Sequence, residues 1–383
     1  MLLMKQADLY APEHLGIKDV LIEGEKILSI QDHIELSDPI DGLQVIQADH
    51  KLMIPGFIDL HEHIIGGGGE GGPWLKTPEA SLKTLLSCGV TTVVGLLGTD
   101  GISRNLTSLI EKARAFNHDG ITAYILTGSY GYPPVTFFDS VEKDIMLMDL
   151  VVGVKTAMSD HRSSAINGEE LIHLAANARR GGLLAGKPGY VTIHMGSGAG
   201  MLDPLFYALD HSDIPVQIFQ PTHMGRTAQL LDQGIEFQKR GGTIDITAGE
   251  DAAHCRETAD QLEHIFQAGF EDQVTVTTDA YGSMPKFNEQ KELIGMTYGI
   301  PDGLLNTLAK LVLEKHIPLE TALKPFTANP AHVLQQSDHK GHISAGADAD
   351  LLLLNSDMTL DTVIARGTKA YGNHTALLHG QFE

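Results

Sequence analysis

Two histidines close an apolar run early in the chain, in the stretch FIDLHEH that ends at His63. Alternate residues of a strand share a face, so His61 and His63 would point the same way. Paired imidazoles suit a divalent metal ion, although backbone groups at the mouth of a loop can also satisfy them. Glycine then fills residues 66–72 apart from Glu70. Such a loop lets the backbone approach a ligand closely, while Glu70 supplies a negative charge.

Polar side chains also close four later apolar runs. These runs are VVGVKT, VTIHMG, FQPTHMG and TVTTDA, and they bring to the strand ends Lys155, His194, His223 and Asp279. A charged group that closes an apolar strand is costly to bury unless it is paired or bound to metal. Four imidazoles and a carboxylate suit zinc, and suit manganese, iron or cobalt less well. The sequence therefore predicts a metal site.

Lys155 allows two interpretations. An ammonium group, with a reference pKa near ~10.4, cannot bind a metal ion. After addition of carbon dioxide it becomes a carbamate, whose two oxygens could bridge two metal ions about 3.5–4 Å apart. Alternatively, Lys155 forms an ion pair with Asp279 in a mononuclear site. The chemistry of the residues alone leaves both interpretations open.

Strand-like runs alternate with helical patterns through the middle of the chain and would position these residues. The runs are GFIDLHEH, VTTVVGLLG, ITAYILTG, LVVGVKT, YVTIHMG, VQIFQPTHMG, GTIDITAG and QVTVTTDA. One helix is expected from Pro78, after Thr77 as its N-cap, to Gly89. Another follows Asn167 and is expected to end at Gly181. Eight strands with helices between them predict an α/β fold, a (β/α)8 TIM-type barrel over residues 55–341, with a doubly wound open sheet as the alternative.

The two ends of the chain differ from this middle part. Residues 1–54 and 342–383 carry short β-type runs separated by turns, without helical periodicity. The two ends are therefore expected to form one small β-sandwich domain together. Within the barrel, catalytic groups gather at the carboxyl ends of several strands, which would collect the polar residues in one place.

Composition limits the classes of partner. The chain has 383 residues, 42% of them hydrophobic, which is enough for a sizeable core. Its formal net charge is −22, and so acidic a surface disfavours nucleic acid and anionic membranes as partners. Cys88 and Cys255 lie far apart, which argues against a disulfide framework or a thiolate metal site. Because the start MLLMKQADLY lacks the apolar core of a signal peptide, we expect a cytoplasmic protein.

Two arginines extend the polar set. Arg162 follows Lys155 by seven residues, and Arg226 follows His223 by three, so both are expected to overhang the same mouth. Taken alone, each arginine is better explained by a surface ion pair. Together with Glu70 they would complement a small zwitterion with one amine and two carboxylates. A dipeptide joined through an acidic side chain has this set of charges.

The sequence resembles the binuclear branch of the amidohydrolase superfamily. The resemblance is carried by PGFIDLHEH, the later strand-end residues and GHISAGADADLLLL. The resemblance implies two divalent metal ions, most readily Zn²⁺, with His61 and His63 on the first and His194 and His223 on the second. It implies a carboxylated Lys155 as the bridging ligand. Asp279 would complete the first site and transfer the proton.

Further motifs resemble the isoaspartyl dipeptidase family specifically. They are the loop GGGGEGG, LLGTDG, TGSYGYPP, KTAMSDHRSS and DAYGSMP. The resemblance implies that a metal-bridging hydroxide hydrolyses the β-aspartyl bond of a small dipeptide, in a homo-oligomer such as an octamer. Glu70 would hold the substrate amine, and Tyr130 would polarise the scissile carbonyl. The carboxylates would be held by Arg162, Arg226 and Ser283, and the pocket would be lined by Gly68 and Thr99.

Three alternatives remain. A cyclic-amide hydrolase of the dihydropyrimidinase or dihydroorotase kind would share the metal residues, but it has less need for Glu70 opposite two arginines. A mononuclear deaminase would not need Lys155. A non-catalytic scaffold would be expected to lack a metal residue, and none is missing from the pattern.

Overall fold

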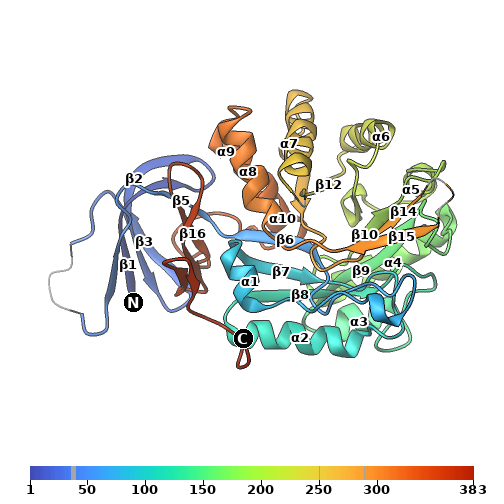
Figure 1. Ribbon diagram of the computed structural model, residues 1–383, viewed down its shortest axis with the longest axis horizontal. Coiled ribbons are helices and arrows are strands. Elements are labelled where there is room, and N and C mark those ends of the chain that lie inside the picture. Colours follow the sequence, from blue (N-terminus) through green and yellow to red (C-terminus); the bar gives the residue numbers. More distant parts are fainter. Residues whose placement is uncertain (36–39, 250, 289, 291) are drawn as a thin grey trace.

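In the computed structural model, the described residues are 1–35, 40–249, 251–288, 290 and 292–383. Helices surround a curled parallel sheet, and a separate β region formed by the chain ends lies beside it (Figure 1). Within the described part of the chain, no helix is long and apolar enough to cross a membrane.

The parallel sheet is built from the predicted strand runs. Its strands are β6 (Phe57–Glu62), β7 (Val90–Gly95), β8 (Thr122–Gly128), β9 (Val151–Met158), β10 (Tyr190–Met195), β11 (Phe219–Thr222), β12 (Ile244–Thr247) and β13 (Val274–Thr277). Strands β6 to β11 pair in sequence order, and β12 pairs with β13. The Met224 amide donates to the Asp245 carbonyl, and the Asp279 amide donates to the His61 carbonyl. The sheet therefore curls until its last strand meets its first.

Helices follow these strands along the chain and bury one apolar face each. They are α1 (Leu82–Ser87), α2 (Leu106–Asp119), α3 (Val141–Leu147), α4 (Gly168–Ala185), α5 (Asp203–Asp210), α6 (Ala228–Lys239), α7 (Ala252–Gln267), α8 (Gly303–Leu313), α9 (Leu319–Leu323) and α10 (Ala328–Val333), with 3-10 turns at Pro73–Leu75, Val216–Ile218 and Lys324–Phe326. In α2, for example, Leu109, Ala113 and Phe116 are buried at a helical spacing. This alternation confirms the expected α/β class with a parallel sheet.

Two predicted helix ends were wrong. The first helix begins at Leu82 instead of Pro78, because the Ser81 side chain accepts the hydrogen bond from the Thr84 amide and caps it there. Helix α4 begins after Asn167 as predicted, with a full capping box, but it continues past Gly181 to Ala185. A β-carbon at Gly181 would lie 2.8 Å from the Glu142 carbonyl oxygen, so this glycine permits close helix packing and does not stop the helix.

Strands from both chain ends lie in one nine-stranded sheet. They are β1 (Leu2–Tyr10), β2 (His14–Glu23), β3 (Lys26–Gln31), β4 (Gln44–Gln47), β5 (Leu52–Pro55), β16 (Leu351–Leu354), β17 (Leu360–Ala365), β18 (Thr368–Gly372) and β19 (Thr375–Ala376). The antiparallel pair of β5 and β16, with Met53 opposite Leu353, joins the two ends. Both chain ends therefore contribute strands to one sheet, while the β-sandwich and its domain boundaries stay predictions.

A hairpin that was not predicted follows β13. Its strands are β14 (Met284–Phe287) and β15 (Leu293–Thr297), which pair antiparallel. In Figure 1 the hairpin lies on the side of the molecule away from the sheet of the chain ends. It directly follows Ser283, so it extends the loop that carries a predicted substrate residue.

Candidate metal centre

The curled sheet brings the six predicted metal residues together. His61 lies in β6 and His63 directly follows it, while His194 is the penultimate residue of β10. His223 follows the last residue of β11, and Asp279 lies two residues beyond β13. The expected position of Lys155 at a strand end was wrong, because β9 continues through Ala157 to Met158.

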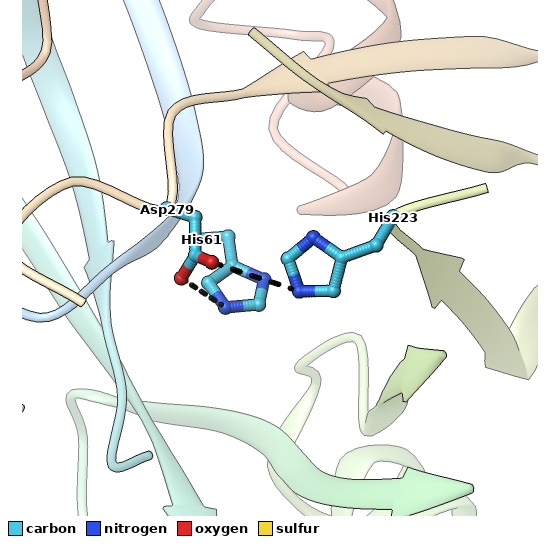
Figure 2. Close-up of side chains that lie close together, drawn as sticks. All are labelled: His61, His223 and Asp279. Carbon is cyan, nitrogen blue, oxygen red and sulfur yellow. Dashed lines mark ion pairs between the residues drawn. The ribbon is translucent and has the colours of Figure 1, made fainter. Parts of the chain in front are cut away.

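Short distances join these side chains. The His61 Nε2 atom lies 2.7 Å from the Lys155 amine and 3.3 Å from an Asp279 oxygen. The same carboxylate lies 3.0 Å from His63 Nε2 and 3.8 Å from His223 Nε2. Figure 2 shows Asp279 facing both His61 and His223, and ligand atoms of these three residues all lie within 4.8 Å of one another. The His194 and His223 rings stand edge to face, 4.5 Å apart between centroids.

Several nitrogens of this cluster are buried without a hydrogen-bond partner. They are His61 Nδ1, His63 Nδ1 and His223 Nε2. A buried polar atom without a partner is unfavourable by about 1–3 kcal/mol, so three in one place need a physical explanation. For His223, the Thr247 hydroxyl lies 2.6 Å from Nδ1, which leaves Nε2 as the atom directed into the cluster. A metal ion would satisfy His223 Nε2, and the Nε2 atoms of His61 and His63 face the same Asp279 carboxylate, so the residues fit the predicted metal ions.

Burial keeps the histidines of the cluster in the neutral form that binds metal ions. Burial, and next to it the Lys155 charge, lowers the pKa of His61 to about 3, and burial lowers the pKa values of His194 and His223 well below their usual range. Although burial alone would raise it, the neighbouring histidines hold the pKa of Asp279 well below its usual range. Burial also lowers the pKa of Lys155 to about 7. Neutral imidazoles, a carboxylate and an amine that is partly uncharged therefore coexist at neutral pH.

Three loops around the cluster contain left-handed residues other than glycine. His223 has a φ of 64° and Asp279 has a φ of 52°, and Ser159 on a third loop has a φ of 54°. Such backbone conformations are costly for side chains with a Cβ, and in folded proteins they are found preferentially at functional sites. Here they turn each chain sharply where its strand ends.

Tyr130 lies beside the cluster, as predicted. Its hydroxyl is 2.6 Å from His194 Nδ1, and its ring is buried. Burial raises the pKa of Tyr130 far above neutral pH, so the hydroxyl keeps its proton and can donate a hydrogen bond. The Arg162 guanidinium lies 5.4 Å from the ring centroid, so Tyr130 contacts both His194 and an arginine.

A cavity of about 490 Å³ opens over the cluster. Its lining includes Tyr130, Asp160, Arg162, His194, Arg226, Asp279 and Ser283. The Ser283 hydroxyl lies 2.9 Å from both Glu70 oxygens, and Arg162 Nη1 lies 3.5 Å from Glu70. The structure thus brings the predicted carboxylate together with Arg162 and Ser283. Arg226 reaches the same cavity, with Nη2 3.5 Å from His194 Nε2.

Gly68 and Thr99 line a second cavity, of about 360 Å³, that Glu70 also borders. The glycine loop closes on itself at this point: a β-carbon at Gly68 would lie 2.5 Å from the Leu75 carbonyl oxygen, and its φ is 87°. The Gly67 amide donates to the Tyr281 carbonyl, which ties the glycine loop to the loop of Ser283. The glycines therefore let Glu70 reach Ser283.

Sequence reasoning missed two residues of this site. Asp160 lies in the cavity wall and contacts both Arg162 and His194, and Thr247 contacts His223. Asp160 could have been predicted only from the stretch SDHR, where it lies two residues before Arg162. For Thr247, the strand-end position in TIDIT was the only signal.

Comparisons with known proteins agree with this geometry. The family model described as "Amidohydrolase family" matches residues 273–363. A crystal structure of beta-aspartyl dipeptidase from Fervidobacterium islandicum AW-1, in complex with a beta-Asp-Leu dipeptide, is 39% identical, and the match covers 98% of each chain with a TM-score of 0.91.

Two further proteins are more distant. A crystal structure of dihydropyrimidinase from Brevibacillus agri NCHU1002 is 17% identical, with a TM-score of 0.68 over 99% of this chain and 96% of the other, and it shows the fold alone. A dihydroorotase from Staphylococcus aureus is 33% identical over 99 residues, which is 26% of this chain. The chain spans only 22% of the length of that curated relative.

Proposed function

Because the chain belongs to the beta-aspartyl dipeptidase family of the amidohydrolases, we propose that it hydrolyses the β-aspartyl bond of isoaspartyl dipeptides in a metal-dependent reaction. One observation carries this proposal. A carboxylate, Glu70, and two arginines, Arg162 and Arg226, lie around a cluster of histidines, a lysine and an aspartate. The relative with the same fold holds a β-aspartyl dipeptide, whose amine and two carboxylates match these charges.

Two zinc ions are the proposed cofactors. His61, His63 and Asp279 would hold one, and His194 and His223 the other, with a carboxylated Lys155 between them. The lowered pKa of Lys155 supports the carbamate, because only an uncharged amine adds carbon dioxide. An ammonium group 2.7 Å from His61 would instead repel a cation. When bound, the ions would polarise the scissile carbonyl and lower the pKa of the attacking water towards ~7.

The protein's own groups would carry the remaining chemistry. Glu70 binds the substrate amine, and Arg162, Arg226 and Ser283 bind its carboxylates. Tyr130, which keeps its proton, donates a hydrogen bond to the carbonyl oxygen as negative charge develops there. Asp279, which is ionised, accepts the proton of the attacking water and passes it to the departing amine. No covalent acyl intermediate is required.

A cyclic-amide hydrolase is not favoured. The dihydroorotase likeness covers about a quarter of this chain, and the dihydropyrimidinase likeness is one of fold. A cyclic amide has no free α-amine for Glu70, which would then be left buried beside Ser283 without a cation from the substrate.

The wider organisation belongs to the same proposal. Residues 1–54 and 342–383 would form a small β-sandwich domain, and residues 55–341 a closed (β/α)8 barrel. A homo-oligomer in the cytoplasm follows from the resemblance and the composition of the sequence, and size-exclusion chromatography with light scattering would test the assembly.

The proposed function is tested by comparing three substrates. We expect zinc-loaded protein to cleave β-Asp-Leu, to leave α-Asp-Leu intact and to leave dihydrouracil closed, and we expect a chelator to abolish the cleavage. Release of leucine, followed by chromatography, measures the first two reactions. Opening of dihydrouracil without cleavage of β-Asp-Leu would contradict the proposal.

A further inference from the structure

Asp160 holds Arg162 through three hydrogen bonds. Its Oδ1 atom accepts from the Arg162 amide at 2.8 Å and from Nε at 3.0 Å, and its Oδ2 atom accepts from Nη2 at 2.9 Å. The two side chains are buried, with 3% of Asp160 and 13% of Arg162 exposed. A planar guanidinium held along one edge by a carboxylate has a fixed orientation.

The contact with Asp160 uses Nε and Nη2, and Nη2 also lies 3.4 Å from His194 Nε2. The third nitrogen, Nη1, lies 3.5 Å from Glu70. The guanidinium also lies over the Tyr130 ring. Arg162 therefore has little rotational freedom, and its Nη1 edge points at the group that would bind the substrate amine.

Asp160 itself is held in place by its loop. The Gly198 amide donates to the Ser159 carbonyl at 2.7 Å, and the Gly196 amide donates to the Met158 carbonyl at 3.0 Å. A β-carbon at Gly196 would lie 2.5 Å from the Asp160 Cα atom, so the two loops fit only with glycine there. Asp160 is thus a rigidly held hydrogen-bond acceptor.

We propose that Asp160 is a positioning residue for substrate recognition: it fixes the Arg162 side chain so that one edge receives a substrate carboxylate. This inference rests on the proposed function, since it takes Arg162 to bind the substrate. A free arginine would lose side-chain entropy when it bound a carboxylate, and an arginine fixed in advance avoids much of that loss. The charge of Asp160 also offsets one of the two cations that face the cavity.

The test compares Asp160→Asn with wild type on β-Asp-Leu, with zinc content and thermal stability measured on the same samples. We expect KM to rise about tenfold or more, which corresponds to about 1.4 kcal/mol, while kcat changes much less. Zinc content should stay at the wild-type value, because Asp160 is not one of the proposed ligands. In the background of Arg162→Ala, Asp160→Asn should raise KM no further, because its effect runs through Arg162.

Two variants complete the design. Glu142→Gln removes the carboxylate from an exposed pair with Arg180 that has the same two-point geometry, far from the cavity, and it should leave KM unchanged. Asp160→Glu is the second variant, for the case that Asp160→Asn folds poorly. Because it keeps the negative charge, it should raise KM by less than the tenfold expected for Asp160→Asn.

Three results would overturn the inference. The first is an unchanged KM in Asp160→Asn. The second is a rise in KM in the Arg162→Ala background as large as that in wild type. The third is a loss of zinc from Asp160→Asn, which would show that Asp160 acts through His194. Wild-type protein without activity on β-Asp-Leu would instead refute the proposed function, and this inference with it. The two failures are therefore distinguishable.

Discussion

Lys155 shows how burial decides the chemistry of a single side chain. It is fully buried inside β9, next to His61, and burial lowers its pKa to about 7. A lysine at this position is poorly suited to act as a permanent cation, because burial and, to a smaller extent, Arg226 and Arg162 disfavour its charge, although Asp279 and Asp245 favour it. The carbamate interpretation, which the residues alone left open, gains physical support from this environment.

Removal of Lys155 gives a prediction at the residue scale. We expect Lys155→Ala to lose activity by about 10³-fold or more, because the bridging ligand is lost, and to regain part of it when a short-chain carboxylate is added. Hydrolysis of β-Asp-Leu with and without added acetate or propionate measures this. Lys187→Ala removes another partly buried lysine, which donates to the Met148 carbonyl, and should leave activity intact. Full activity of Lys155→Ala would refute the bridging role.

The residues predicted from sequence share one property. Each metal residue closes, or nearly closes, an apolar run, so its position on a strand predicts that it meets the others. Asp160 has no such property. Its role depends on a loop that folds back on the loop after His194 through backbone hydrogen bonds, which no local pattern encodes. The left-handed conformations of His223 and Asp279 were equally unpredictable, because their residue types do not require them.

At the scale of elements, close contact between neighbouring strands positions the metal residues. Gly128 ends β8, has a φ of 84° and lies against β9, where a β-carbon would come within 2.3 Å of the Lys155 carbonyl oxygen. A larger residue there must displace the backbone that carries Lys155. Strand spacing at this point is therefore coupled to the geometry of the metal centre.

Gly128→Ala tests this coupling. We expect about 1–2 kcal/mol of lost stability from the left-handed conformation and about 1–3 kcal/mol more from the clash, together with weaker zinc binding. Gly186→Ala is the matched control, because it has a φ of 65° but open space around its Cα. The control should lose stability only by the first amount and keep its zinc. Thermal melts and zinc content measure both effects, and equal behaviour of the two variants would contradict the coupling.

The helix ends show the limit of sequence signals at this scale. Asn167 was identified correctly, because its capping box is local to the sequence. Gly181 was predicted to end the helix, because the sequence does not distinguish a glycine that allows close packing against Glu142 from a glycine that ends a helix. The hairpin of β14 and β15 was missed, since its strands are short and follow a polar loop.

At the scale of the whole molecule, an ion cluster around the buried Lys340 joins the sheet of the chain ends to the curled parallel sheet. Lys340 is 5% exposed, and its amine contacts Asp350 at 2.5 Å and Asp348 at 3.0 Å. Lys26, on β3, also contacts Asp348. The Asp350 carbonyl accepts from the Gly56 amide, directly before β6. One cluster thus links both chain ends to β6, the first strand of the curled sheet.

The cluster makes stability depend on pH. Partial burial raises the pKa of Asp348, but Lys340 and Lys26 outweigh burial and lower it below the usual value of about 3.9. The stabilising contribution of Asp348 is therefore complete above about pH 4 and is lost as the pH falls through the lower folded value. We expect Asp348→Asn to lower Tm at pH 7, and the difference from wild type to shrink below pH 4. A difference that stayed constant down to pH 3 would contradict this assignment.

Two metal ions in this cavity are proposed to make the protein a β-aspartyl dipeptidase. Zinc titration of metal-free protein, with β-Asp-Leu hydrolysis and bound zinc measured at every point, tests this proposal most directly. Activity is predicted to be absent without metal and to reach its plateau at about two zinc ions per chain. Full activity in protein that contains no metal, or a plateau after a single ion, would contradict the account.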